Sequence, residues 1–437
     1  MRNLKKTTSA LLASALALSL CMTGCVKKPG STPAPESNPT SGTSSTPASP
    51  EDSLTGELSG KLTVWVGDTQ LAVFEKIAKD FSDDTGMEVE LVPYTGLSAT
   101  DKLALDGPAG KGGDVYVQGG GGGLGKAAEQ GLFMAIPEGI FNTEDFTKST
   151  IDDYTYKGQL YGMPMGAETA ALMYNKALIS EIPETFEELI EVCNKNVDFK
   201  ADKYGFLMDT TNPYFTMSFF DANGGYVFGQ KDGVYDVSDI GLNTQGVKDT
   251  MRVFVDYYNK GYFMKNMAFD VMEKKFGEGK APVIFDGPWA VSNFVGQGID
   301  VGVAPIPKLA NGNYPRTYSG VYGVSISEYT KNQRASVEFV KYCVREESIM
   351  EYYRATKRIP PLKACLESDE VKNDPIVKGF SDQLEHSMPQ PNVPEMDAMW
   401  GPMIDAATLI ITQGLDVDTT MDKAVEKFKE QINIMTK

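Results

Sequence analysis

Histidine is nearly absent from the 437-residue sequence, in which His386 is the only one. Zinc sites of the HExxH type need two histidines, and serine hydrolase triads need a histidine as the base. The scarcity of histidine therefore excludes multi-histidine metal sites and most histidine-based catalysis. We expect no metal ion, no cofactor and no catalytic residue in this chain.

Basic residues are also fewer than acidic ones. The sequence contains 41 Lys and Arg residues and 59 Asp and Glu residues, which gives a net charge of -18. A nucleic-acid-binding protein needs a basic surface to neutralise phosphate groups. The composition therefore argues against nucleic acid as a partner. With 41% apolar and 23% charged residues, the chain is long enough for about two or three globular domains of roughly 150 residues each.

The first 25 residues have the pattern of a secretory signal peptide. Basic residues precede an apolar segment, residues 11–20, that is too short to span a bilayer. The pattern ends in Met-Thr-Gly-Cys25, which resembles the box of bacterial lipoproteins, where the cysteine receives a lipid and becomes the first residue. The alternative is ordinary cleavage nearby, which leaves Cys25 as a spare thiol.

Residues 26–59 have the composition of a flexible tether. They are rich in proline, serine, threonine and glycine and contain almost no apolar side chains, so burial cannot offset the entropy lost on ordering. With a lipid on Cys25, this segment would hold a folded module on the outer face of the bacterial cell membrane.

The globular part contains few cysteines. Cys193, Cys343 and Cys365 are odd in number and have no close spacing, which excludes a disulfide framework and a CxxC metal site. A bridge between Cys343 and Cys365 stays open, because an exported protein meets an oxidising environment.

Hydrophobic periodicity predicts a β-α-β unit at the start of the globular part. Residues 62–66 suit a buried strand, 71–85 an amphipathic helix that ends at Gly86, and 87–93 and 114–118 two further strands. A parallel sheet follows from this order. Further strands are expected at 282–285, 300–304 and 321–326, and helices at 245–260, 289–294, 332–344, 396–412 and 419–435.

Several short segments resemble the solute-binding proteins of ABC sugar importers, and among these the maltose/maltodextrin-binding proteins. The segments are Lys61-Leu-Thr-Val-Trp-Val-Gly-Asp68, Tyr161-Gly-Met-Pro-Met-Gly-Ala-Glu168, Asn212-Pro-Tyr-Phe-Thr216, Phe285-Asp-Gly-Pro-Trp289 and the run from Pro391 to Trp400. They occur in the order and at the spacing of that family. The resemblance implies an α/β fold of two lobes with a hinge between them, each lobe a mixed, mainly parallel sheet flanked by helices.

The resemblance also implies that the chain crosses between the lobes more than once, near residues 166–169 and 307–318. The N-terminal lobe would then comprise 60–167 and 319–370, and the C-terminal lobe 168–318 and 371–437. Proteins of this family close on a sugar by hinge motion and present it to a membrane permease and its ATPase. They are not enzymes, and we expect a monomer with an oligosaccharide ligand.

A sugar offers apolar C–H faces and a rim of hydroxyl groups, so its site needs aromatic rings together with carboxylates or amides. Tyr214, Trp289 and Trp400 match positions that stack on sugar rings in the maltodextrin-binding proteins. Core packing is the alternative for each of them. Trp65 lies on an alternating apolar strand, and we assign it to the core.

Asp68 and Glu168 match sugar-binding acids of the family, with a helix cap or a solvated position as the alternative for each. Asn212 stands where a glutamate is common, no basic residue follows Asp68, and the glycines at 119–123 replace a loop that carries an Asp-Arg pair. Each lost hydrogen bond to a sugar lowers affinity. We therefore expect a longer or differently linked oligosaccharide rather than maltose, with Gln118 or Asn212 as a source of the missing bonds.

Three functions other than that of a transport binding protein are also open to a sequence of this kind. The run from Gly120 to Ala127 approximates a phosphate-binding P-loop, but Ala127 replaces the hydroxyl residue that would hold magnesium, which argues against a nucleotide. A glycoside-processing enzyme would need two carboxylates beside the scissile bond, and any acidic protein offers candidates. A surface receptor or sensor with this fold would differ only in its partner.

Overall fold

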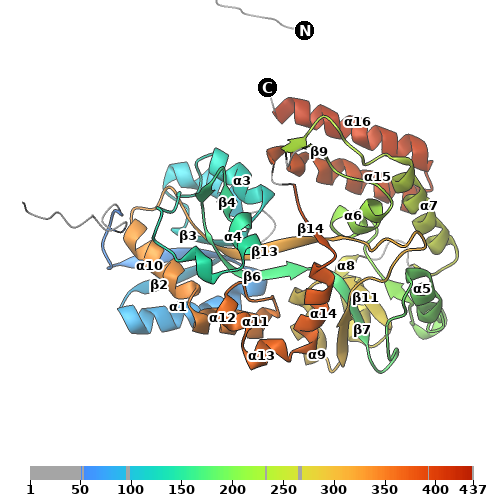
Figure 1. Ribbon diagram of the computed structural model, residues 1–437, viewed down its shortest axis with the longest axis horizontal. Helices are drawn as coiled ribbons and strands as arrows, with labels where there is room; N and C mark the ends of the chain where they lie inside the picture. The colour runs from blue at the N-terminus through green and yellow to red at the C-terminus, as the bar shows by residue number, and fades with distance from the viewer. Residues whose placement is uncertain are drawn as a thin grey trace, which may run out of the picture. The chain divides into compact units, whose positions relative to one another are not determined.

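The computed structural model of the protein describes residues 51, 54–94, 99–231, 234–263, 268–391 and 393–435. The predicted signal peptide with Cys25 and most of the predicted tether lie outside the described residues. The described residues form an α/β structure in which helices flank two main sheets (Figure 1).

Strands and helices alternate along most of the described chain. The strands are β1 (Lys61–Gly67), β2 (Glu88–Tyr94), β3 (Val115–Gly119), β4 (Thr155–Tyr156), β5 (Gln159–Leu160), β6 (Met163–Thr169), β7 (Ala171–Asn175), β8 (Phe206–Leu207), β9 (Gly229–Lys231), β10 (Val234–Asp236), β11 (Val283–Asp286), β12 (Val301–Ala304), β13 (Thr317–Ile326) and β14 (Ser387–Pro389). The α-helices are α1 (Leu71–Thr85), α2 (Ala99–Asp106), α3 (Gly122–Glu129), α4 (Lys148–Asp153), α5 (Phe186–Asn194), α6 (Pro213–Ala222), α7 (Gln245–Asn259), α8 (Phe269–Gly277), α9 (Val291–Gly296), α10 (Gln333–Cys343), α11 (Glu346–Thr356), α12 (Lys363–Leu366), α13 (Asp369–Lys372), α14 (Pro375–Leu384), α15 (Trp400–Gln413) and α16 (Val417–Met435). Short 3-10 helices are η2 (Asp68–Gln70), η3 (Gly107–Ala109), η4 (Thr143–Asp145), η5 (Phe199–Ala201), η6 (Pro288–Ala290) and η7 (Pro394–Met399).

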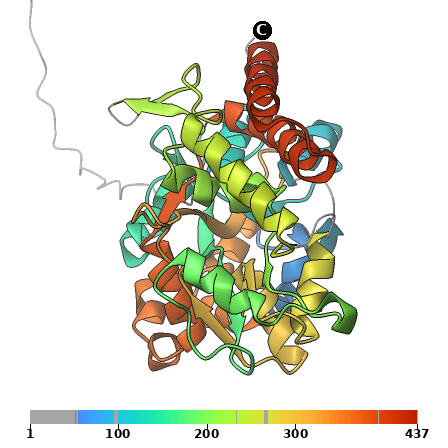
Figure 2. The same ribbon diagram turned by 90° about the vertical axis from the view of Figure 1, so that its right-hand side faces the viewer.

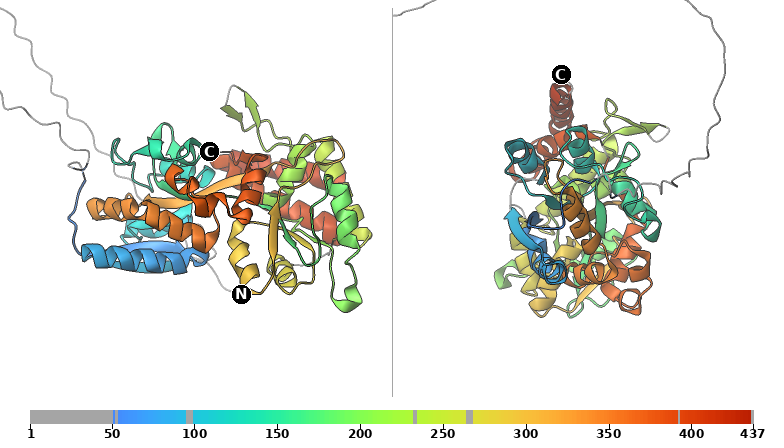
Figure 3. Two further views of the ribbon diagram at one scale, coloured as in Figure 1. Left: turned by 60° about the horizontal axis from the view of Figure 1, so that its bottom comes forward. Right: turned by 90° about the vertical axis from the view of Figure 1, so that its left-hand side faces the viewer.

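The predicted β-α-β unit is confirmed. β1 pairs in parallel with β2 and with β3, and α1 connects the first two strands. The helix ends where Gly86 adopts a left-handed conformation, with φ of 76°, and donates its N–H to the Ser82 carbonyl. α1 packs against β2, α10 and α11, and Figure 3 shows α1 and α10 running side by side.

The six-stranded sheet is completed by strands from distant parts of the chain. β13 pairs antiparallel with β3 and with β6, and parallel with β14, in the order β14-β13-β3-β1-β2 with β6 on the other edge of β13. β13 therefore joins the N-terminal β-α-β unit to β6 and β14, which come from two later parts of the chain. Residues 319–322 of β13 and Glu168 of β6, which lie on paired strands, border a cavity that is described below.

The four-stranded sheet has the order β12-β7-β11-β8. β7 pairs antiparallel with both β12 and β11, and only β11 and β8 are parallel. The expectation of a mainly parallel sheet is therefore right for the six-stranded sheet and wrong for this one. The reason is that β7 arrives from β6 and inserts between β11 and β12, a direction that strand and helix patterns alone do not reveal.

The chain passes from the six-stranded to the four-stranded sheet between β6 and β7, and returns between β12 and β13. After β14 it continues into α15 and α16, which pack against each other and against α7. Figure 2 shows these two C-terminal helices, in red, close to the yellow-green α7. The C-terminal segment thus returns to the neighbourhood of the four-stranded sheet.

The core contains the residues that the strand pattern assigns to it. Trp65 is 4% exposed and packs on Tyr116 with ring centroids 5.0 Å apart, so its assignment to the core is confirmed. Cys193, Cys343 and Cys365 are buried and free, so the open question of a Cys343–Cys365 bridge is answered in the negative. Within the described ranges, no helix is long and apolar enough to cross a membrane.

Candidate ligand-binding site

A cavity of about 380 Å³ lies where elements next to the two sheets meet. Glu168 on β6 and Tyr322 on β13 come from the six-stranded sheet, whereas Tyr214 at the start of α6 and Trp289 in η6 follow strands of the four-stranded sheet. The remaining lining residues are Thr69, Asn212, Phe215, Phe269 and Arg358. The volume lies within the range of roughly 300–1,000 Å³ that is usual for small-molecule sites.

A second cavity, of about 220 Å³, adjoins the first. It shares Glu168, Tyr214 and Tyr322 with it and extends to the glycines at 119–121, Asp153, Ser319, Gly320, Val321 and Gln390. Because the two cavities share three side chains, we treat them as one site and call it the cleft.

Aromatic rings form a row that begins in the cleft. The centroids of Trp289 and Tyr214 are 6.2 Å apart, those of Tyr214 and Tyr318 6.2 Å, and those of Tyr318 and Trp400 6.5 Å. Trp289, Tyr214 and Trp400 are half-buried, so part of each ring remains accessible. We call these four residues the aromatic row.

Local sequence explains how the row is presented. Pro213 and Pro288 start their helices, because a fixed φ suits the first helical position, and each places an aromatic residue next to it. A Cβ on Gly287 would lie 2.1 Å from the Trp289 ring, so only glycine allows the indole to fold back at this point.

Asn212 lies in the cleft with one end already engaged. Its Oδ1 accepts a hydrogen bond of 3.0 Å from the Tyr214 N–H and so caps α6. The amide nitrogen is the end that is left to face a ligand. The position is therefore both a helix cap and a lining residue of the cleft.

A buried ion pair is the main polar feature of the cleft. Arg358 Nε donates to Glu168 Oε2 over 2.5 Å, and the two residues are 3% and 6% exposed. The guanidinium also lies 4.5 Å from the Tyr322 ring centroid. Burial by itself lowers the pKa of Arg358, but the Glu168 carboxylate together with the hydroxyls of Tyr352 and Tyr322 outweighs this effect and raises the pKa above its usual value, so the cation is retained.

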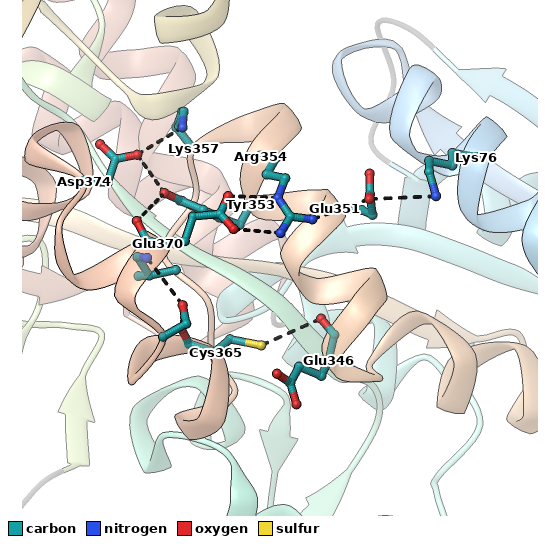
Figure 4. Close-up of polar contacts among 11 residues, drawn as sticks. Lys76, Glu346, Glu351, Tyr353, Arg354, Lys357, Cys365, Glu370 and Asp374 are labelled. Atoms are coloured by element: carbon teal, nitrogen blue, oxygen red, sulfur yellow. Dashed lines mark hydrogen bonds and ion pairs between the residues drawn. The ribbon is translucent and has the colours of Figure 1, made fainter.

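Arg358 reaches Glu168 from a site 190 residues away, because a polar network holds the turn after α11 (Figure 4). Lys357 ends α11 in a left-handed conformation, with φ of 56°, and donates to Asp374 over 3.0 Å. The Tyr353 hydroxyl donates to the same carboxylate over 2.7 Å. Arg354 adds two hydrogen bonds to Glu370, of 2.8 and 2.7 Å. Residues before the turn and at the turn are therefore both held by hydrogen bonds.

Asp153 places a second carboxylate beside the glycine loop. The Gly121 N–H donates to the Asp153 carbonyl over 2.8 Å, and a Cβ on Gly120 would lie 2.8 Å from that carbonyl, which explains the requirement for glycine there. Burial raises the pKa of Asp153 to about 6. Asp153 and Arg358 are lining residues of the cleft that sequence reasoning missed, and neither carries a local motif that could have revealed it.

The glycine loop does not have the arrangement of a phosphate cradle. The Gly120 N–H donates to the Val321 carbonyl over 2.8 Å, so two successive amides of the loop are already engaged. Lys126, which a P-loop would aim at phosphate, pairs with Asp397 over 2.7 Å. These contacts agree with the argument against a nucleotide.

The structure brings together most, but not all, of the predicted site residues. Glu168, Asn212, Tyr214 and Trp289 line the cleft, and Asp68 begins η2 directly before the lining residue Thr69. Trp400 lies beyond Tyr318 in the aromatic row and does not line the cleft.

Gln118 lies beneath the glycine loop instead of in the cleft. It is 5% exposed, and its Nε2 donates to Ser325 Oγ over 3.0 Å. A donor held inside the sheet in this way is not directed at a ligand. Among the described residues, no cluster of three or more histidine, cysteine or acidic side chains could hold a metal ion.

Comparison with known proteins identifies the family. Residues 76–379 match the family described as bacterial extracellular solute-binding protein. The galactooligosaccharide-binding protein of Bacillus subtilis (strain 168) is 31% identical over 393 residues, or 88% of this chain and 93% of that protein. A maltooligosaccharide ABC transporter solute-binding lipoprotein of Streptococcus pneumoniae is 30% identical over 437 residues, or 97% of each protein. The structure of the Thermus thermophilus maltotriose-binding protein with maltotriose aligns with a TM-score of 0.79 and 28% identity, covering 85% of this chain and 100% of that chain.

The chain therefore belongs to the bacterial extracellular solute-binding proteins. The resemblance drawn from the short sequence segments is confirmed, and so is the two-lobed α/β fold class. The family is described as extracellular, and the members named above are binding proteins by name.

Proposed function

We propose that this solute-binding protein takes up an oligosaccharide in the cleft and delivers it to the permease and ATPase of an ABC importer. The observation that carries the proposal is a single cavity in which the rings of Tyr214 and Trp289 accompany the buried pair of Glu168 and Arg358. Rings suit the apolar faces of a sugar, and charged groups suit its hydroxyls.

The ion pair has hydrogen-bonding capacity left for a ligand. Arg358 Nη1 is buried and has no hydrogen-bond partner among the described residues. An unsatisfied buried donor costs roughly 1–3 kcal/mol, so a sugar oxygen that accepts from it gains affinity. The second oxygen of Glu168, which the Arg358 Nε bond does not use, would accept from a neighbouring hydroxyl.

The ligand we propose is a malto- or galacto-oligosaccharide longer than a disaccharide. The relatives named above support this class by what they are named for. The glycines at 119–121 offer no side chain to a sugar, and Asp153 supplies the nearest carboxylate on that side of the cleft. A ligand that lacks contacts there must recover them along the aromatic row, which favours a longer chain.

Uptake would work by closure of two lobes, residues 60–167 with 319–370 and residues 168–318 with 371–437. The passages of the chain between the two sheets, at β6–β7 and β12–β13, support the boundaries at 167/168 and 318/319 because they are where a hinge would bend. The membrane partner would recognise the closed form. A lipid on Cys25 and the tether 26–59 would keep the monomeric protein at the outer face of the cell membrane.

We further propose that the protein binds its sugar without converting it. A glycoside hydrolase needs one carboxyl group that donates a proton to the leaving oxygen. Glu168 is already engaged by the Arg358 guanidinium over 2.5 Å, so it is not placed to deliver a proton to a leaving oxygen. A surface receptor or sensor would use the same cleft and differ only in the protein that it contacts.

Calorimetric titration of the purified protein with malto- and galacto-oligosaccharides of two to seven units tests the proposal. We expect binding of at least one series, a loss of affinity of roughly 30-fold or more in Trp289→Ala, and recovery of the sugar intact by chromatography. Absence of binding to both series would refute the oligosaccharide ligand, and shortened sugars would refute the non-enzymatic role.

A further inference from the structure

A third cavity, of about 420 Å³, lies beside the β9–β10 hairpin and belongs to none of the sites predicted from the sequence. The hairpin projects from the neighbouring elements at the top of Figure 2. The lining residues that matter here are Asp221, Gln230, Tyr235, Arg316, Tyr318 and Met388. We call this space the hairpin cavity, and its volume again falls within the range of roughly 300–1,000 Å³ for ligand sites.

The hairpin cavity contains a polar group that has no partner in the protein. The Tyr318 side chain is 2% exposed, and its hydroxyl is buried without a hydrogen bond to any described residue. Buried hydroxyls in native proteins are normally paired. Burial raises the pKa of Tyr318, and Asp221 and Tyr235, which also line the cavity, raise it further.

The charges of the hairpin cavity cancel. Arg316 donates through Nε and Nη2 to the two oxygens of Asp221, over 2.7 and 2.6 Å. The Asp221 side chain is only 12% exposed, whereas that of Arg316 is 52% exposed. A fork of this kind still offers one guanidinium nitrogen and carboxylate lone pairs, but it has no net charge to attract an ion. The ligand should therefore be neutral and polar.

The walls of the hairpin cavity are flat and apolar. Tyr318 and Met388 are cross-strand partners in the β13–β14 pair, so their side chains project from the same face. Tyr235 contributes a further ring from the hairpin. Flat apolar walls combined with neutral hydrogen-bonding groups match a pyranose ring, which has apolar faces and a hydroxyl rim.

The hairpin cavity also adjoins the cleft. The Tyr318 ring is the member of the aromatic row that contacts both Tyr214 and Trp400. The residues next to its lining positions, Ser319 and Gln390, line the cleft. The two spaces are therefore separated by little more than the β13–β14 ribbon.

We propose that the hairpin cavity is a second carbohydrate subsite, which binds one neutral hexopyranose unit through Tyr318, Tyr235 and the Asp221–Arg316 fork. The proposal rests on the proposed oligosaccharide function of the cleft. The same chemistry has two sources: the far end of a long oligosaccharide whose first units occupy the cleft, or a second, separate saccharide molecule.

Two variants block the hairpin cavity without touching the cleft. Tyr235→Ala removes one wall, and Gln230→Trp fills the space from an exposed position on the hairpin, where a bulky side chain does not disturb the core. Tyr262→Ala is the matched control, because Tyr262 packs against the same apolar cluster but lines none of the three cavities.

The first arm of the test measures dissociation constants for sugars of three and seven units by calorimetry. If a long chain reaches the cavity, the parent and Tyr262→Ala should bind the longer sugar about tenfold more tightly, and both blocking variants should reduce that ratio to about one. Binding of the three-unit sugar should change by less than about twofold.

The second arm measures stoichiometry with the three-unit sugar at high concentration. If a separate molecule occupies the cavity, the parent should bind two per chain and the blocking variants one. The inference is overturned if the blocking variants leave both the length ratio and the stoichiometry unchanged while Trp289→Ala still weakens binding in the cleft by roughly 30-fold or more. Absence of any sugar binding, by contrast, refutes the proposed function itself.

Discussion

The two walls of the cleft are made of different chemistry. The wall on the side of the six-stranded sheet carries charge, with Glu168 on β6, Arg358 after α11 and Asp153 at the end of α4. The wall on the side of the four-stranded sheet carries rings, with Tyr214 at the start of α6 and Trp289 in η6. We call them the polar wall and the aromatic wall.

The difference implies that the two walls contribute unequally to ligand affinity and to the stability of the protein. Charged side chains that are buried must be paired to be tolerated, so the polar wall is tied into the fold through the network of Figure 4. Half-buried rings need no hydrogen-bond or ion-pair partner in the protein, so the rings of the aromatic wall remain available for a ligand. Damage to the polar wall should therefore destabilise the protein, whereas damage to the aromatic wall should mainly weaken binding.

Arg358→Met should give the largest effect. It leaves the Glu168 carboxylate buried without its partner, and loss of one member of a buried pair costs roughly 3–5 kcal/mol in the free energy of unfolding. Urea denaturation at neutral pH measures this loss.

The control is the double variant Glu168→Leu with Arg358→Met. Replacing both members by apolar side chains removes the unpaired charge, so most of the lost stability should return while sugar binding stays absent. A double variant as unstable as the single one would show that the pair is held by more than charge compensation.

Trp289→Ala tests the aromatic wall. Its ring is half-buried at the cleft, so the variant should bind oligosaccharide more weakly by about 2 kcal/mol or more, roughly 30-fold, with little loss of stability. Trp65→Ala is the matched control, since its ring is buried in the core and its loss should cost roughly 3–5 kcal/mol of unfolding free energy. Equal destabilisation by the two substitutions would assign Trp289 to the core as well.

The aromatic wall could be predicted from the sequence because its signals are local. Pro213-Tyr214 and Pro288-Trp289 each place a ring at a helix start, and this dipeptide pattern is visible without any tertiary information. The β-α-β unit and the long helices α1, α7, α10, α15 and α16 were predictable for the same reason, since their hydrophobic periods lie within one segment.

The polar wall could not be predicted in this way because its members meet only in the folded chain. Arg358 follows a helix end with no motif around it, and its partner lies 190 residues earlier. The absence of a basic residue beside Asp68 predicted a site with fewer hydrogen bonds to the sugar. In the structure, Arg358 supplies a positive charge to the cleft from another segment of the chain. The antiparallel direction of β7 escaped prediction for the same physical reason.

Chain length of the ligand gives the next smaller effect. The aromatic row extends from the cleft to Trp400, whereas the glycines at 119–121 leave part of the polar wall without side chains. A three-unit or longer sugar that covers more of the row should bind at least about tenfold more tightly than its disaccharide, a difference of about 1.4 kcal/mol. Calorimetry on one sugar series measures it, and a disaccharide that binds as tightly as every longer sugar would mean that the polar wall alone sets affinity.

The smallest effect should appear as a pH dependence of stability that originates in the polar wall. Burial raises the pKa of Asp153 from 3.8 to about 6. Between these two values the folded state retains a proton that the unfolded state releases, so the free energy of unfolding falls as pH rises through the interval and becomes level above it. Asp153→Asn keeps an oxygen for the Val321 N–H but cannot ionise, so it should match the parent near pH 4 and exceed its stability at pH 8. The full shift corresponds to roughly 3 kcal/mol, but the carboxyl is partly exposed and screened by water, so we expect a difference of about 1 kcal/mol. Glu138→Gln, a change at an exposed carboxylate outside the cleft, should leave this pH dependence intact, and denaturation curves of the parent and both variants from pH 4 to 8 provide the measurement. If the unfolding free energies of the parent and Asp153→Asn differed by the same amount at every pH, the carboxylate would be ionised throughout this range. The polar wall would then contribute no pH dependence to stability.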